Sequence, residues 1–254
     1  MLARYGVLGW PVGHSRSPAM MRAAGLERYQ RLPVAPEALA DTIRALGAAG
    51  FGGANVTIPH KEAALAVADT ASEAAREIGA ANTLTFAADG SVAADNTDAP
   101  GLIAALEHRI PETALVLGAG GSARAAVWAL TRAGVDVCVW NRTPERAAGL
   151  GVRVVARPCR AELLVNCTSV GLDRSSMVFK ELPLDADGLR EYTTVVDLVY
   201  RTGGTSLIAE AARRGLHTVD GLEILVRQGA LSFALWTGLP APLQSMRAAV
   251  RDPG

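Results

Sequence analysis

Hydrophobic residues follow two spacings along this chain. Short apolar runs such as 4–9, 53–58 and 114–117 have the length and composition of buried strands, whereas stretches such as 122–132 carry apolar residues every third or fourth position. The first spacing predicts strands and the second predicts helices. Because the two alternate through most of the chain, we expect an α/β protein with mostly parallel sheets.

The first hundred residues contain strand-like and helix-like segments in alternation. The predicted strands are 4–9, 53–58 and 82–86, with a further strand-like run before Asp95, and the predicted helices start at Ser17-Pro18 or occupy 37–46, 61–68 and 71–78. We expect Ser17 to be the N-cap of the first helix, because serine is favoured there and proline suits the first helical position.

From about residue 102 the alternation becomes more regular. A helix at 122–132 follows the first of the predicted strands, which are 114–117, 135–140, 163–167, 194–198 and 217–219. Strands joined by helical crossovers at this spacing are typical of a nucleotide-binding sheet. The last stretch, 222–250, predicts two amphipathic helices interrupted at 238–240. Such helices need a partner surface, which the first domain could supply.

The composition excludes several classes of protein. The 254 residues carry 25 basic and 25 acidic side chains, so no overall charge attracts nucleic acid or an anionic membrane. The chain opens on a strand-like run rather than a basic-then-apolar leader, and no apolar stretch reaches the roughly 18 residues of a membrane-spanning helix. A cytoplasmic protein is therefore expected. The histidines and cysteines show no ligand spacing, so no metal is expected.

The glycine-rich stretch Gly118-Ala119-Gly120-Gly121-Ser122-Ala123 directly follows the predicted strand 114–117. It matches the pattern G-x-G-x-x-G/A, in which the first glycine permits a tight turn, the second lets a pyrophosphate approach the backbone, and a small sixth residue allows close helix–strand packing. The free N–H groups of the following helix then face the phosphates. A purely structural turn is the alternative, but the place between strand and helix favours a nucleotide site.

The end of the next predicted strand indicates which dinucleotide is preferred. An NAD-selective site usually has a carboxylate there to bind the ribose hydroxyls. This chain has Asn141-Arg142-Thr143, followed by Arg146. Guanidinium groups bind the 2′-phosphate of NADP, which a carboxylate would repel. We therefore expect NADP, although the same residues could also form a helix start with Thr143 as the N-cap.

Polar residues also gather near the strand ends of the first half. Among the basic residues only Lys61 and Lys180 are lysine, and lysine, unlike arginine, can exchange a proton. Codon usage explains the excess of arginine equally well, and Asp98 taken alone is an N-cap candidate. However, Thr57, Lys61, Asn82 and Asp98 all lie at or beside predicted strand ends, where open α/β sheets bind ligands.

Two hydroxyl groups lie in the loop that follows the first predicted strand. Ser15 and Ser17 stand at the start of the expected helix. Hydroxyls in such a position form a suitable site for an anion or a carboxylate.

Together these motifs resemble the shikimate dehydrogenase family over nearly the full chain. The matching stretches are 9–18, 55–61, 79–84, 96–98, 118–123, 141–143, 166–169, Gln228 and 235–238. The resemblance implies reversible reduction of 3-dehydroshikimate to shikimate with NADPH, in the pathway to aromatic amino acids. It implies two α/β domains, a substrate domain at 1–101 onto which 222–254 packs back, and a Rossmann-type NADP domain at 102–221. We expect a monomer or a homodimer.

The resemblance also implies roles for individual residues. Lys61 and Asp98 would be the catalytic pair that handles the proton at the reacting oxygen. Ser15 and Ser17 would bind the substrate carboxylate, and the ring hydroxyls would contact Thr57, Asn82, Tyr200 and Gln228. The NADP site would comprise Gly118, Ala119, Gly120, Gly121, Ser122, Asn141, Arg142, Thr143, Arg146, Thr168, Leu198 and Gly221.

Some positions depart from the family pattern. Met21-Arg22 replaces a usual His-Asn or His-Gln, Ser206 replaces a proline, and Glu223 replaces a glycine. None of these changes removes a proposed catalytic or ligand residue, but a carboxylate at Glu223, near the nicotinamide end, could alter cofactor fit or substrate preference. Two alternatives stay open: a paralogue acting on quinate or an aminoshikimate, and a non-catalytic NADP-binding regulator, which would be expected to lack Lys61 or Asp98.

Overall fold

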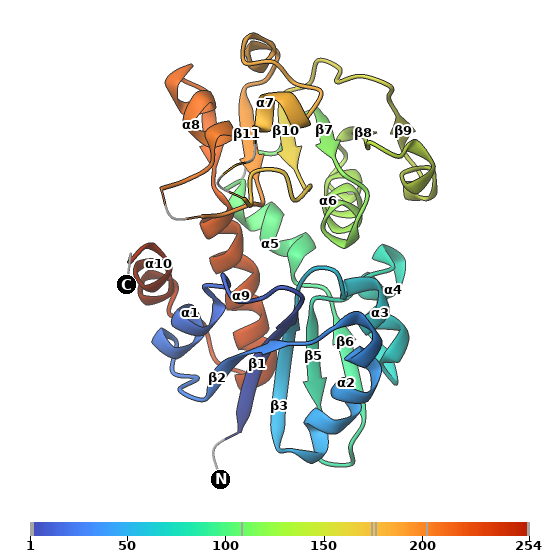
Figure 1. The fold of residues 1–254 in the computed structure, drawn as a ribbon, viewed down its shortest axis with the longest axis vertical. Coiled ribbons are helices and arrows are strands. Elements are labelled where there is room, and N and C mark those ends of the chain that lie inside the picture. Colours follow the sequence, from blue (N-terminus) through green and yellow to red (C-terminus); the bar gives the residue numbers. More distant parts are fainter. Residues whose placement is uncertain (1–2, 108, 174, 176, 202, 253–254) are drawn as a thin grey trace. The chain divides into compact units, whose positions relative to one another are not determined.

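The computed structural model describes residues 3–107, 109–173, 175, 177–201 and 203–252 (Figure 1). The chain forms two compact units. Unit 1 comprises Met1–Gly101 and Leu225–Gly254, and unit 2 comprises Leu102–Ile224. The chain passes from one unit to the other within helix α5 (Asp98–Ala105) and helix α9 (Gly221–Thr237).

Unit 1 contains a six-stranded sheet of order β2-β1-β3-β5-β6-β4. β5 runs antiparallel to its neighbours β3 and β6, whereas the other pairs are parallel. The strands are β1 (Arg4–Gly9), β2 (Tyr29–Pro33), β3 (Phe51–Val56), β4 (Thr70–Ala71), β5 (Thr83–Phe86) and β6 (Val92–Asp95). The helices of this unit, besides parts of α5 and α9, are α1 (Ser17–Ala23), η1 (Pro36–Ala38), α2 (Leu39–Ala48), α3 (Lys61–Val67), α4 (Glu73–Ile78) and α10 (Leu243–Arg251).

The two faces of this sheet differ in chemistry. Leu8, Val56 and Leu84 point into an apolar cluster that α2 completes with Ile43 and Leu46. The other face lies against α9 and is partly polar and aromatic. There the Trp236 indole donates a hydrogen bond to the Leu84 carbonyl oxygen at 3.0 Å and lies beside the rings of two tyrosines. The C-terminal helix α10 packs against α1, which anchors the end of the chain in unit 1 (Figure 1).

Unit 2 contains a fully parallel sheet of order β9-β8-β7-β10-β11-β12. Its strands are β7 (Thr113–Leu117), β8 (Asp136–Trp140), β9 (Arg153–Val154), β10 (Leu163–Asn166), β11 (Thr194–Asp197) and β12 (His217–Val219), and its helices are α6 (Gly121–Arg132), η2 (Pro144–Arg146), η3 (Ala148–Leu150), α7 (Val178–Glu181), η4 (Asp187–Glu191) and α8 (Ser206–Arg213). Successive strand residues enter different clusters: Val116 faces the α6 side, and Leu115 and Leu117 face the α8 side. The strand order reverses between β7 and β10, which is where Rossmann sheets bind their ligands.

The predicted α/β class with mostly parallel sheets is confirmed. Most of the elements not predicted are short, but the eight-residue helix α8, which buries Leu207 and Ala211, was not predicted either. β2 is an edge strand whose residues Gln30 and Arg31 are exposed, so it lacks the apolar run of a buried strand. β4 and β9 have two residues each. Within the described residues, no helix is long and apolar enough to cross a membrane, and no three His, Cys, Asp or Glu side chains gather as metal ligands.

Candidate active site

One edge of the unit 1 sheet collects most of the polar residues named above. Thr57 directly follows β3, and Asp98 lies three residues after β6, so both are at carboxyl ends of strands that run in the same direction. Asn82 immediately precedes β5. Because β5 is antiparallel, its beginning lies at that same edge, where Thr83 pairs with both Asn55 and Asp95. The reversed strand thus brings Asn82 in beside the turn that carries Asp98.

Lys61 is fixed by the segment that follows β3. It is the first residue of α3, and its carbonyl oxygen accepts a hydrogen bond from the Ala81 N–H at 2.8 Å. The neighbouring His60 is buried, with its ring Nε2 2.7 Å from the Val34 carbonyl oxygen. The Lys61 ammonium lies 2.6 Å from the Asp98 carboxylate, and the two side chains are only 11 and 13 % exposed. A charge-assisted hydrogen bond with so little solvent access holds both groups in a defined geometry.

The Asp98 carboxylate is available for this pair because another residue caps α5. The Asn96 side-chain oxygen accepts hydrogen bonds from the N–H groups of Asp98 at 3.1 Å and Ala99 at 3.2 Å. Asp98 is itself the first helical residue, so the interpretation of its side chain as an N-cap is wrong. Its second carboxylate oxygen accepts a hydrogen bond from the Asn82 amide at 2.8 Å.

Asn82 connects the charged pair to α9. It is 2 % exposed, and its amide nitrogen lies 2.8 Å from Asp98 Oδ1, 2.9 Å from Thr97 Oγ1 and 3.2 Å from Gln228 Oε1. Gln228 in turn donates to the Leu225 carbonyl oxygen at 2.7 Å. The two amide hydrogens are therefore shared among three acceptors, and the Gln228 oxygen, which is the most distant, accepts the weakest hydrogen bond.

A buried polar network behind Asn82 was not identified from the sequence. The Asn55 amide donates to the Ser232 hydroxyl at 2.8 Å, and its oxygen accepts from the Tyr29 hydroxyl at 2.8 Å. Thr83 and Ser232 are hydrogen-bonded at 2.8 Å. The available sequence signal was Ser232, a polar residue between the apolar residues of 229–231 and 233–236. Because buried polar groups that satisfy one another are rigid, this network supports the position of Asn82.

Ser15 lies on the loop between β1 and α1, and Ser17 is the first residue of α1; they are 3 and 4 % exposed. The Ser15 hydroxyl accepts a hydrogen bond from the Ser17 N–H at 3.2 Å. Among the described residues, neither hydroxyl proton has an acceptor. The expectation that Ser17 is the N-cap is wrong: Arg16 occupies that position without a side-chain cap, and Ser17 is the first helical residue. Its hydroxyl is therefore free for a ligand.

The glycine-rich turn of unit 2 connects β7 to α6. Gly118 has φ +112°, and a Cβ there would lie 3.2 Å from the Cys167 carbonyl group, so the turn requires glycine. At Gly120 a Cβ would meet nothing within 4 Å, which leaves an open approach to the backbone. The turn precedes α6 and lies beside β10, at the reversal of strand order. This backbone fits a dinucleotide pyrophosphate.

The end of β8 presents the residues expected at the 2′-phosphate. The Asn141 amide donates to the Thr143 carbonyl oxygen at 2.7 Å. Arg142 and Arg146 are exposed, and their guanidinium groups make no hydrogen bond or ion pair with any described residue. Thr143 occupies the N-cap position of η2, but its side chain makes no capping hydrogen bond. Two guanidinium groups are thus available to an anion.

A buried carboxylate supports the remaining residues of this site. Asp197 is fully buried and accepts hydrogen bonds from the Asn166 amide at 2.9 Å, the Val199 N–H at 3.0 Å and the Thr205 hydroxyl at 2.7 Å. Burial is the largest influence on this group and raises the pKa of Asp197 to about 6. Asn166 also accepts a hydrogen bond from the Thr168 hydroxyl at 2.7 Å. Asp197 therefore connects the loops after β10 and β11.

Gly221 and Tyr200 complete the predicted set. A Cβ at Gly221 would lie 2.7 Å from the carbonyl oxygens of Leu198 and Val199, so the start of α9 approaches this loop too closely for any other residue. The Asp220 side chain accepts a hydrogen bond from the Glu223 N–H at 2.9 Å. Tyr200 lies in unit 2, whereas the other residues proposed to bind substrate lie in unit 1.

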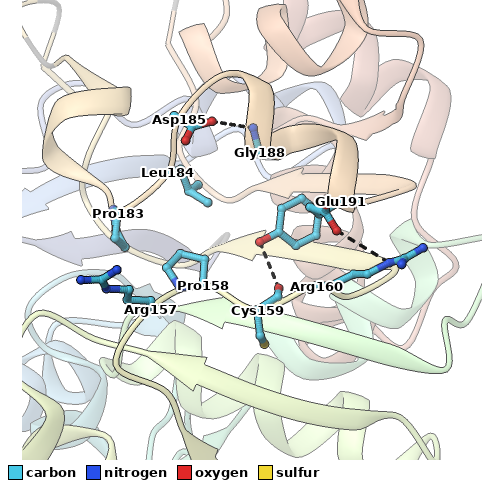
Figure 2. A pocket seen from close by; sticks show the side chains of 10 residues that line it. Arg157, Pro158, Cys159, Arg160, Pro183, Leu184, Asp185, Gly188 and Glu191 are labelled. Carbon is cyan, nitrogen blue, oxygen red and sulfur yellow. Dashed lines mark hydrogen bonds and ion pairs between the residues drawn. The ribbon is translucent and has the colours of Figure 1, made fainter.

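A separate hollow of about 440 Å³ in unit 2 contains none of the predicted residues (Figure 2). Its polar groups largely satisfy one another. Arg160 pairs with Glu191 at 3.7 Å, the Tyr192 hydroxyl donates to the Cys159 carbonyl oxygen at 3.3 Å, and Asp185 accepts from the Gly188 N–H at 2.6 Å. We therefore place the candidate chemistry elsewhere.

A dinucleotide turn in one α/β unit and a lysine–carboxylate pair in another are typical of a dinucleotide-dependent oxidoreductase. Residues 7–84 match the family model of the shikimate dehydrogenase substrate binding domain, and residues 221–251 match that of the shikimate 5'-dehydrogenase C-terminal domain. The chain is 45% identical to a shikimate dehydrogenase (NADP(+)) of Thermus thermophilus, covering 98% of each chain. It is also 45% identical to that of Paracoccus denitrificans, over 92% of this chain and 90% of the relative.

A solved structure agrees with these relatives. The crystal structure of shikimate 5-dehydrogenase from another strain of Thermus thermophilus, in complex with NADP(H) and shikimate, has a TM-score of 0.87 and 46% identity, covering 98% of each chain. This chain belongs to the shikimate dehydrogenase family.

Proposed function

We propose that this protein is an NADP-dependent shikimate dehydrogenase, which reversibly reduces 3-dehydroshikimate to shikimate in the pathway to aromatic amino acids. The observation that carries the proposal is the Lys61–Asp98 pair, held at 2.6 Å and linked to Asn82. The names of the relatives and the ligands of the similar crystal structure give the substrate and cofactor.

Lys61 and Asp98 handle the proton at the reacting oxygen in this proposal. A ketone that is being reduced develops negative charge on its oxygen, which a nearby ammonium group stabilises and then protonates. The Asp98 carboxylate orients the ammonium group, and the Asn82 amide orients the carboxylate. In the oxidative direction Lys61 accepts the proton from the substrate hydroxyl.

The other polar groups of unit 1 bind and orient the substrate in this proposal. The hydroxyl groups of Ser15 and Ser17, whose protons have no acceptor among the described residues, donate hydrogen bonds to the substrate carboxylate. The ring hydroxyls contact Thr57, Asn82 and Gln228, and the Gln228 oxygen is the most distant of the three acceptors around the Asn82 amide. Tyr200, in unit 2, is also proposed to bind substrate.

Unit 2 is proposed to bind NADP. The chemistry that this cofactor supplies when bound is hydride transfer. The backbone from Gly118 to Ser122 would hold the pyrophosphate, and the open approach at Gly120 fits that role. Arg142 and Arg146 would hold the 2′-phosphate, together with Asn141 and Thr143. Thr168, Leu198 and Gly221 would line the rest of the site.

The direct test is turnover by the purified protein. We expect shikimate and NADP to yield NADPH, followed by its near-ultraviolet absorbance, with a higher kcat/KM than shikimate with NAD or quinate with either cofactor. No turnover of shikimate with either cofactor would refute the proposal. A higher kcat/KM for quinate or an aminoshikimate would favour a paralogue, and cofactor binding without turnover of any of these substrates would favour a regulator.

We also propose a cytoplasmic location and a monomer or homodimer. Cell fractionation tests the first, and sedimentation equilibrium tests the second. A larger oligomer in solution would contradict the second statement.

A further inference from the structure

Arg31 on the edge strand β2 contacts the loop between β1 and α1 at Ser15, two residues before the second buried serine, Ser17. Its Nε and Nη2 atoms donate hydrogen bonds to the Ser15 carbonyl oxygen at 3.0 and 2.7 Å. Arg31 pairs in register with Val7 of β1, so the strand itself holds the base of the side chain. Two donors on one acceptor fix the guanidinium group more firmly than one would.

Arg31 has no carboxylate partner among the residues that the structure describes. Its hydrogen bonds go to a neutral carbonyl oxygen. The pKa of His14, one residue before Ser15, is lowered by burial and further by the positive charge of Arg31. The positive charge of Arg31 therefore acts electrostatically on the residues of this loop.

This loop and the first residue of α1 have hydrogen-bond donors without acceptors among the described residues. The Ser15 N–H donates to the Val12 carbonyl oxygen at 3.0 Å, which tightens the turn, and the Ser17 N–H donates to the Ser15 hydroxyl. The hydroxyl protons of both serines have no acceptor among the described residues, although both side chains are more than nine-tenths buried. Buried donors are normally satisfied, so this arrangement suits an acceptor-only group with negative charge.

We infer that Arg31 is a positioning and specificity-determining residue for the carboxylate of the substrate. Its fork holds the Ser15 carbonyl and so aims the two hydroxyls, while its positive charge favours an anionic ligand over a neutral one of the same shape. The inference rests on the proposed function. Arg31 takes no part in the reaction at the ring carbon. It sets the preference for an anionic over a neutral group at the carboxylate position of the ligand.

The experiment compares shikimate with its neutral methyl ester in Arg31→Met and Arg31→Lys. For Arg31→Met we expect the preference for the acid over the ester, as a ratio of kcat/KM values, to fall about tenfold through KM, with kcat and the KM for NADP within about twofold of the original protein. Arg31→Lys keeps the charge without the fork, and we expect an intermediate ratio. Arg44→Met, on the exposed side of α2, removes the same charge elsewhere and should leave the ratio unchanged.

Salt provides a second measurement. The KM for shikimate of the original protein should rise with added NaCl, and in Arg31→Met it should rise less, because the attraction that salt screens has been removed. Unchanged selectivity in Arg31→Met would overturn the inference while leaving the proposed function intact. If that variant does not fold, the same ratio measured in Arg31→Lys decides, and a value within twofold of the original overturns it. Absence of shikimate turnover in the original protein would overturn both.

Discussion

The candidate sites of the two units are built in opposite ways. In unit 1 the side chains come from distant parts of the sequence and hydrogen-bond one another: Lys61 and Asp98 are 37 residues apart, and Asn82 and Gln228 are 146 residues apart. In unit 2 the central feature is one continuous turn, Gly118 to Ser122, which offers backbone groups. Arg142 and Arg146, which follow the next strand, have no partner among the described residues.

The difference has a consequence for how each site responds to substitution. Members of a hydrogen-bonded network support one another, so losing one disturbs the rest and the effects of two losses do not add. Separate contacts with a ligand contribute separately, and their effects multiply in the affinity. Substitutions in the unit 1 site should therefore have non-additive effects, whereas substitutions in the unit 2 site should have independent effects.

The largest effect is expected from removing the Lys61 amine. Lys61→Met should lower kcat about a thousandfold, because it removes the group that exchanges the proton, while NADP binding measured by calorimetry survives. Asp98→Asn should also lower kcat, and the double variant should be little worse than Lys61→Met alone. Lys180→Met is the matched control, because it removes the chain's other lysine from an exposed position in unit 2. Near-normal kcat in Lys61→Met would refute the catalytic assignment.

The contrast between the units also explains what could be predicted from the sequence. The turn at Gly118 is a local motif, and its geometry follows from glycine residues at fixed spacing beside a strand. The unit 1 site depends on the direction of β5, which no local pattern reveals. With a parallel β5, Asn82 would lie at the far edge of the sheet.

Which side chain caps helix α5 could not be predicted from the sequence either. Asn96 and Asp98 are both good capping residues, and only the structure shows that Asn96 caps α5 and leaves the Asp98 carboxylate for Lys61. The resemblance to a known family implied the Lys61–Asp98 pair, which the spacing of residues in the sequence alone could not predict. Arg31 was missed because β2 is an exposed edge strand without an apolar run.

Substitutions at two glycines of the unit 2 turn, Gly118 and Gly120, should separate effects on folding from effects on binding. Gly118→Ala should destabilise the protein by about 3 kcal/mol, because a Cβ at φ +112° is strained and approaches the Cys167 carbonyl group. Gly120→Ala has open space and an ordinary φ of −84°, so it should fold normally and yet bind NADP more weakly. Chemical denaturation and calorimetry measure the two quantities. Equal stability losses in both variants would contradict the distinction.

Asp197 lies in a buried hydrogen-bonded network that resembles the one in the unit 1 site. The titration of Asp197 tests this network. Its pKa is raised to about 6 in the folded protein, so between about pH 4 and pH 6 the folded chain holds a proton that the unfolded chain has lost. Its contribution to the free energy of unfolding should therefore fall by about 2 to 3 kcal/mol as pH rises through that range. Denaturation of the original protein and of Asp197→Asn isolates it, because the variant cannot titrate there. A stability difference independent of pH would contradict this assignment.

The smallest effect is expected at Arg142, an exposed residue whose guanidinium group contacts no described partner. Arg142→Ala should raise the KM for NADP about tenfold, the loss of one charge-assisted contact, and leave the KM for NAD unchanged because NAD lacks the 2′-phosphate. Combined with Gly120→Ala, the two losses of NADP affinity should multiply, since the residues would contact different phosphates. An equal rise in the KM for both cofactors would show that Arg142 acts on the fold of the loop. If the double variant binds NADP no more weakly than the weaker-binding single variant, the unit 2 site is a coupled network like that of unit 1.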